Sequence, residues 1–144
     1  MSQHRQRLCE PLRYTLTELE EQDWGPPTFD SWLVRSVHQL RNVPLKDLTA
    51  GDVRLLIGQK VGLPYLVPLA INVLTADPFI DGSLYAGDLL QGVIQIPRDF
   101  WHTHESLASE VALVARQALD SADIAEVGTA LKTELQLFIE TQTA

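Results

Sequence analysis

The 144-residue sequence lacks the features that secreted domains use for stability and export. It holds a single cysteine, Cys9, so no disulfide can form within the chain. This is typical of a protein that works in a reducing compartment. Residues 1–14 carry three arginines but no apolar run of the kind found in a secretory signal. We therefore expect a cytoplasmic protein.

Basic residues are scarce: 11 Lys and Arg stand against 19 Asp and Glu, and the net charge is −8. Nucleic-acid binding needs clustered Lys and Arg to neutralise phosphates, so this balance argues against a direct nucleic-acid partner. Two acidic runs, 15–30 and 61–97, contain no basic residue, whereas residues 31–60 are net positive. Acidic runs can attract a basic protein, and they can also serve solubility alone. Charge leaves both interpretations open.

The chain has no apolar run long enough to cross a membrane. From Leu63 to Leu74 all residues but three are apolar. That is about 12 residues, where a bilayer requires roughly 20. A helix that is apolar on all sides is buried, and Pro64 and Pro68 fit only its first turn. With a helix over 50–59 it should form a central apolar hairpin that the other helices cover.

Strand-like alternation of apolar and polar residues is absent, whereas helical periodicity recurs. We predict an all-α bundle of about seven helices joined by short loops. A single domain is expected over 1–144, with 1–14 as a loosely held arm. The helices are expected near 15–21, 31–40, 50–59, 63–76, 86–93, 104–119 and 122–141. The residues predicted to be buried together are Leu56, Ile57, Leu66, Leu69, Ile71, Leu89 and Leu90.

The three tryptophans receive different interpretations. Trp32 lies beside the apolar face of the helix over 31–40, so we place it in the core. Trp101 is expected to pack under the two long C-terminal helices. Trp24 stands in an acidic segment before Gly25 and two prolines. It is either a structural plug or a binding anchor, because exposed aromatic residues are enriched at interface hot spots.

No constellation of residues for catalysis is recognisable, and we expect no enzymatic activity, cofactor or metal. His102 and His104 are closely spaced, but a zinc site needs further ligands at useful spacing. Asp77, Asp81 and Asp88 are too far apart in sequence to match a calcium-binding loop. The serines lack the G-x-S-x-G context of a hydrolase nucleophile.

A long series of short motifs runs in a distinctive order between residues 16 and 101. The series is Asp23-Trp24-Gly25, Phe29-Asp30-Ser31, Leu33-Val34-Arg35, Pro44-Leu45, Asp52-Val53-Arg54, Ile57-Gly58-Gln59, Gly62 to Ala70, Asp77-Pro78 and Tyr85 to Leu90. This order resembles the immunity proteins of bacterial contact-dependent growth inhibition systems. The two C-terminal helices contribute nothing to the resemblance.

The resemblance implies a small helical protein that protects its own cell and is not an enzyme. Such a protein binds the toxic C-terminal domain of a delivered surface effector tightly and without a covalent bond, over the active site or beside it. Many of those toxins are nucleases, and acidic segments suit a basic nuclease. The candidate toxin-binding residues are Glu18, Glu20, Glu21, Asp23, Trp24, Asp77, Asp81 and Asp88.

Two other functions are compatible with the residues. A small helical enzyme or ligand-binding protein would use Tyr65, Asp88 and a cleft between helices, and a helical adaptor would dock on a host protein. A buried polar cluster in a deep pocket would favour the enzyme or ligand-binding protein. A broad exposed acidic face with aromatic residues would favour toxin binding.

Overall fold

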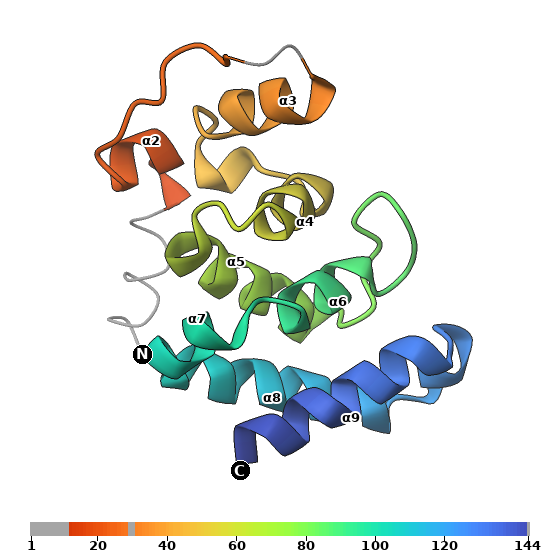
Figure 1. Cartoon of the computed structure of the whole chain (residues 1–144). Coiled ribbons are helices and arrows are strands. Elements are labelled where there is room, and N and C mark those ends of the chain that lie inside the picture. The colour runs from red at the N-terminus through yellow and green to blue at the C-terminus, as the bar shows by residue number, and fades with distance from the viewer. Residues whose placement is uncertain (1–11, 29–30, 144) are drawn as a thin grey trace.

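The computed structural model describes residues 12–28 and 31–143 (Figure 1). These residues are helical, and the all-α prediction is confirmed. The arm predicted for residues 1–14 lies almost entirely outside the described residues. The elements are α2 (Leu16–Leu19), α3 (Trp32–Leu40), η1 (Leu45–Asp47), α4 (Ala50–Gly58), α5 (Leu63–Ala76), α6 (Asp88–Ile94), α7 (Arg98–Thr103), α8 (Glu105–Asp120), η2 (Ala122–Glu126) and α9 (Thr129–Thr143).

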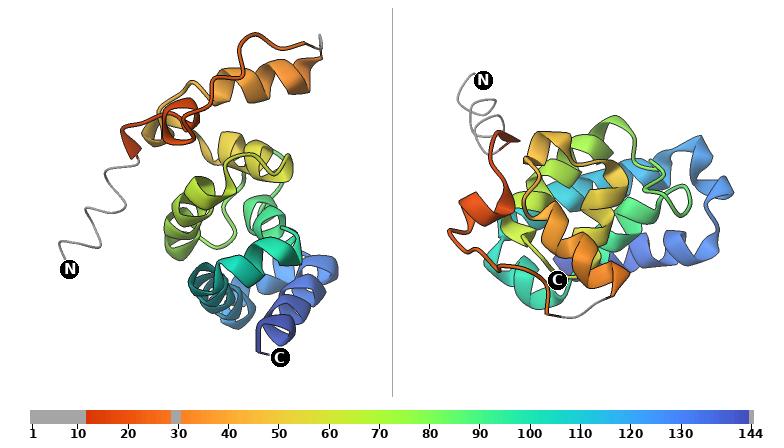
Figure 2. Two further views of the ribbon diagram at one scale, coloured as in Figure 1. Left: turned by 60° about the vertical axis from the view of Figure 1, so that its left-hand side comes forward. Right: turned by 90° about the horizontal axis from the view of Figure 1, so that it is seen from above.

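The helices are stacked in layers from α3 to the pair α8 and α9 (Figure 1). α4 packs against both α5 and α6, and α3 packs against α4. α8 lies beneath α5, and α9 contacts both α8 and α6. The predicted hairpin of α4 and α5 is therefore central. Figure 2 shows α2 and α3 at one end of the molecule, away from α8 and α9.

Side-chain caps explain where several helices begin. The Thr15 hydroxyl accepts a hydrogen bond from the backbone N–H of Glu18, and the Glu18 carboxylate accepts one from Thr15. Thr49 and Asp52 form the same reciprocal pair at the start of α4. Ser31 caps α3 by accepting from the N–H of Val34. Each cap satisfies backbone donors that a helix leaves unpaired at its start.

Two details of the predicted helices are wrong, and a further helix, α7, was not predicted. Pro68 lies inside α5 and not in its first turn, because the helix already begins at Leu63. The predicted helix over 122–141 is split into η2 and α9. Gly128 causes the split, since its φ of 91° is left-handed and interrupts a right-handed helix.

The core follows the predicted pattern with two exceptions. Six of the seven residues predicted to be buried together are buried, whereas Leu69 is only partly buried. Trp101 is buried and packs edge-on against Phe138 of α9, with 5.5 Å between ring centroids. Trp32 is 68% exposed, so its predicted place in the core is wrong. It lies about 140° around the helix from buried Val37, at 100° per residue. Within the described ranges, no helix combines the length and apolar composition needed to cross a membrane.

Candidate functional site

The sequence-predicted site residues fall in two places. One group lies on α2 and in the segment that follows it, and the other lies in the connection between α5 and α6 and at the first residue of α6. Figures 1 and 2 show these regions on opposite sides of α4. The two acidic runs therefore form two separate surfaces. We call residues 20–25 the Trp24 segment and residues 81–87 the 81–87 loop.

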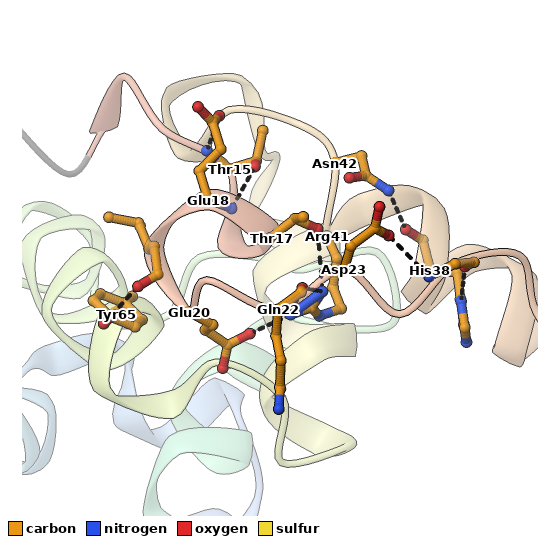
Figure 3. Close-up of polar contacts among 12 residues, drawn as sticks. Thr15, Thr17, Glu18, Glu20, Gln22, Asp23, His38, Arg41, Asn42 and Tyr65 are labelled. Carbon is orange, nitrogen blue, oxygen red and sulfur yellow. Dashed lines mark hydrogen bonds and ion pairs between the residues drawn. The ribbon is translucent and has the colours of Figure 1, made fainter.

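The side chain of Arg41 holds the Trp24 segment in place. It follows the last residue of α3 and is buried. Its guanidinium donates hydrogen bonds to the Thr17 hydroxyl at 3.1 Å and to the Gln22 carbonyl at 3.1 Å, and it pairs with the Glu20 carboxylate at 2.7 Å (Figure 3). Its Nε atom has no hydrogen-bond partner among the described residues, which offsets part of this stabilisation. Arg41 thus ties the end of α3 to the chain that follows α2.

Trp24 is held in place and is still 44% exposed. The guanidinium of Arg41 lies 4.1 Å from its ring centroid, and the His38 ring meets it edge-on at 5.3 Å. The next residue, Gly25, accepts a hydrogen bond from His38 Nδ1 at 3.1 Å and donates its N–H to the Asp23 carboxylate at 2.8 Å. One part of the indole is therefore packed and another faces solvent. The packed part fits the interpretation of Trp24 as a structural plug, and its role as a binding anchor stays a prediction.

The four acidic residues of this surface are not equivalent. Glu18 belongs to the capping box of α2, so its carboxylate is already engaged with the backbone N–H of Thr15. Glu20 is partly buried and neutralised by Arg41. Glu21 and Asp23 are exposed and keep their charge at the surface. The effective negative charge of this surface is consequently smaller than the sequence run suggests.

Asp88 is not a surface residue: it is 3% exposed. Its carboxylate accepts hydrogen bonds from the N–H groups of Gly82 at 2.5 Å and Leu84 at 3.0 Å. Arg54 of α4 lies 3.5 Å from the same carboxylate and donates to the Gly82 carbonyl at 2.8 Å. The candidate toxin-binding residue Asp88 therefore does not present its charge at the surface, because its carboxylate is directed into the preceding loop.

The 81–87 loop instead exposes two large apolar side chains. Leu84 is 64% exposed and Tyr85 is 50% exposed. Asp81 is exposed and accepts the N–H of Ser83 at 2.8 Å, and the nearby Asp77 is also exposed. The sequence analysis did not single out Leu84. The available signal was two large apolar residues that follow Asp81-Gly82-Ser83, in a turn where polar residues are usual.

A groove lies between the link from α6 to α7 and the C-terminal half of α9. Its volume is about 270 Å³. Its lining includes Ile94, Ile96, Trp101, Glu134, Leu137 and Phe138. The two polar residues considered for a ligand site, Tyr65 and Asp88, do not line this groove. The Tyr65 hydroxyl donates to the Leu19 carbonyl, and the Asp88 carboxylate accepts from the N–H of Gly82. In the part of the chain that the structure describes, no three His, Cys, Asp or Glu side chains gather as a possible metal site.

Comparison with known proteins gives a family for most of the chain. Residues 18–111 match the family of CDI immunity proteins. The matched span contains the Trp24 segment, the 81–87 loop and the helices that support them, and it ends within α8. No curated protein and no solved structure matches the chain.

Proposed function

This chain belongs to the family of CDI immunity proteins, and on that premise we propose that it binds and neutralises a cognate toxin. The toxin is the C-terminal domain of a contact-dependent growth inhibition effector. Binding is tight, non-covalent and stoichiometric, and the chain acts in the cytoplasm as an inhibitor and not as an enzyme. The family match over residues 18–111 is the observation that carries this proposal.

A nuclease is the toxin class that the charge favours. A nuclease must neutralise phosphates with Lys and Arg, so its substrate-binding face is basic. A chain with a net charge of −8 is complementary to such a face and is itself poorly suited to nucleic acid. In the proposed complex, this chain contacts the protein surface of the toxin and not the nucleic acid.

The contact residues follow from what each side chain already does in the fold. Glu21, Asp23, Asp77 and Asp81 are exposed and serve as steering charges in this proposal. Glu18 adds negative charge from a position fixed by the α2 cap, whereas Glu20 contributes little charge because Arg41 neutralises it. Trp24 serves as an aromatic anchor, because it is fixed before binding and exposes part of its ring.

Co-expression tests the proposal directly. Cells that produce the toxin domain encoded beside this chain should stop growing, and co-expression of the chain should restore growth. The two purified proteins should form a stable one-to-one complex. If the folded chain neither binds that domain nor protects the cells, the immunity function is wrong.

A second measurement separates the toxin class from the immunity function. The purified toxin domain is incubated with RNA and DNA, and the chain is then titrated into the reaction. Cleavage should disappear at one equivalent of the chain. A toxin domain that the chain neutralises in cells but that cleaves neither nucleic acid would contradict the nuclease assignment alone.

A further inference from the structure

We propose that the 81–87 loop is a preorganised contact element that inserts Leu84 and Tyr85 into an apolar depression with a basic rim on the toxin domain. This inference rests on the proposed immunity function and names a surface for it. The loop lies across α4 from the Trp24 segment (Figures 1 and 2). A toxin domain that contacts both surfaces must therefore reach across α4.

Leu84 is exposed in a way that folding does not explain. Its backbone N–H donates to the buried Asp88 carboxylate at 3.0 Å, yet its side chain is 64% exposed. Any residue other than proline can supply that N–H, so the fold does not require a leucine here. Tyr85 follows directly and is 50% exposed. Two adjacent large apolar side chains on a fixed loop provide what an interface anchor needs.

The loop backbone is held by the buried Asp88 carboxylate and the partly buried Arg54 guanidinium. Asp88 binds the N–H groups of Gly82 and Leu84 with its two carboxylate oxygens, and Arg54 binds the Gly82 carbonyl from α4. Hydrogen bonds to an ionised carboxylate are stronger than neutral ones. The position of Leu84 is thus set before any partner arrives, which lowers the entropy lost on binding.

Close packing and side-chain contacts hold the loop at further points. A Cβ atom on Gly51 of α4 would lie 2.2 Å from the Ser83 hydroxyl oxygen and 3.3 Å from the Gly82 carbonyl oxygen, so a larger residue there would displace the Ser83 side chain. The Tyr85 hydroxyl donates to the side-chain oxygen of Gln91 on α6. Gln91 in turn donates to Glu134 of α9 at 3.1 Å. The ring of Tyr85 is therefore oriented by hydrogen bonds that run through Gln91 of α6 to Glu134 of α9.

Charge around the loop selects the partner. Asp77 and Asp81 are exposed, and the sequence from residue 61 to residue 97 contains no Lys or Arg. Arg54, a cation at the loop base, pairs with Asp88. An apolar tip within acidic surroundings complements an apolar site that basic residues surround, as on the substrate-binding face proposed for the toxin.

Serine substitutions at the tip test the contact. Leu84→Ser and Tyr85→Ser are each compared with Leu113→Ser on α8, where the leucine is 58% exposed. Binding to the toxin domain encoded beside this chain is measured by titration calorimetry. We expect each tip variant to raise Kd by about tenfold or more, which is the effect of an interface hot spot. The α8 variant should leave Kd within twofold, and thermal unfolding should show that all three fold like the wild type.

A substitution at Asp88 tests the positioning role. Asp88→Asn keeps the shape but removes the charge and one acceptor oxygen. The amide protons of Gly82 and Leu84 should then exchange faster with solvent, and toxin binding should weaken. If Asp88 acts by positioning Leu84, its substitution should weaken binding far less in a Leu84→Ser background than alone. Additive effects would overturn the positioning role. If Asp88→Asn does not fold, Arg54→Gln is measured in the same cycle.

Each outcome points to one conclusion. If the wild type does not bind the toxin domain, the proposed immunity function fails. If the wild type binds and protects while Leu84→Ser and Tyr85→Ser bind within twofold of it, the 81–87 loop is not a contact element. In that second case the immunity function stands, and the contact lies on another surface.

Discussion

The guanidinium of Arg41 lies over the indole of Trp24, with its central carbon 4.1 Å from the ring centroid. The same guanidinium pairs with Glu20 at 2.7 Å and donates to the Gln22 carbonyl. One buried side chain therefore fixes both the course of the backbone and the exposed aromatic ring. The stability of this end of the molecule depends on the planar, forked shape of arginine, which lysine lacks.

Arg41→Lys should lower the free energy of unfolding by about 2 kcal/mol, because charged hydrogen bonds and ring stacking are lost while the charge remains. Urea unfolding measures this loss. Arg116→Lys on the exposed face of α8 is the matched control and should stay within about 0.5 kcal/mol of the wild type. Equal stability of the two variants would show that the contacts of Arg41 contribute nothing measurable.

Trp24→Ala and Trp32→Ala should differ although both side chains are exposed to solvent. Trp24→Ala removes the cation–π contact and the His38 contact, and should cost about 1–2 kcal/mol of stability. Trp32→Ala should change stability by less than about 0.5 kcal/mol, since this ring is 68% exposed. Urea unfolding of both variants decides. A cost for Trp32→Ala as large as that for Trp24→Ala would mean that Trp32 packs against the body of the protein.

The error over Trp32 shows what helical periodicity can predict. The predicted helix over 31–40 does have an apolar inner face, on which Val37 is buried. The pattern did not reveal how wide the inner face is, because that depends on how many neighbours the helix has. α3 packs chiefly against α4, so its buried stripe is narrow. The central hairpin was predictable for the opposite reason: α5 is apolar on nearly all sides and is covered by several helices.

The candidate site was predictable only in part. The sequence identified the acidic runs and Trp24, which are local features of composition. It did not distinguish exposed Asp81 from buried Asp88, because burial depends on the N–H groups that the folded loop turns toward the carboxylate. Leu84 was missed because periodicity carries no information in a loop. Arg41 was missed because the hydrogen-bond partners of its side chain are at least 19 residues away in sequence.

Leu66→Ala and Leu69→Ala should separate the two sides of α5. Leu66 is fully buried, so its truncation should cost about 2–5 kcal/mol. Leu69 is only partly buried, and its truncation should cost less than about 2 kcal/mol because the neighbouring solvent prevents a closed cavity. Thermal or urea unfolding measures both. The reverse order would mean that α5 is rotated about its axis relative to the structure.

Charge removal should reveal which acidic residues steer the toxin. One variant carries Glu21→Gln and Asp23→Asn, and a second carries Asp77→Asn and Asp81→Asn. Asparagine keeps the oxygen that accepts the backbone N–H of the turn, so the local structure should persist. Glu18 and Glu20 are left unchanged because they cap α2 and pair with Arg41. The matched control, Asp123→Asn with Glu126→Gln, removes the same charge from η2.

Association of these variants with the toxin domain is measured by stopped flow at several salt concentrations. Both test variants should associate more slowly than the control at low salt, because complementary charge acts mainly on the rate of encounter. The difference should shrink at about 0.5 M salt, where screening confines exposed charges to a few ångströms. Dissociation rates should change little, since exposed charges at the rim of an interface affect association more than dissociation. Association as fast as that of the control at every salt concentration would contradict steering by these four residues, and the acidic residues of α8 and α9 would then be the ones to test.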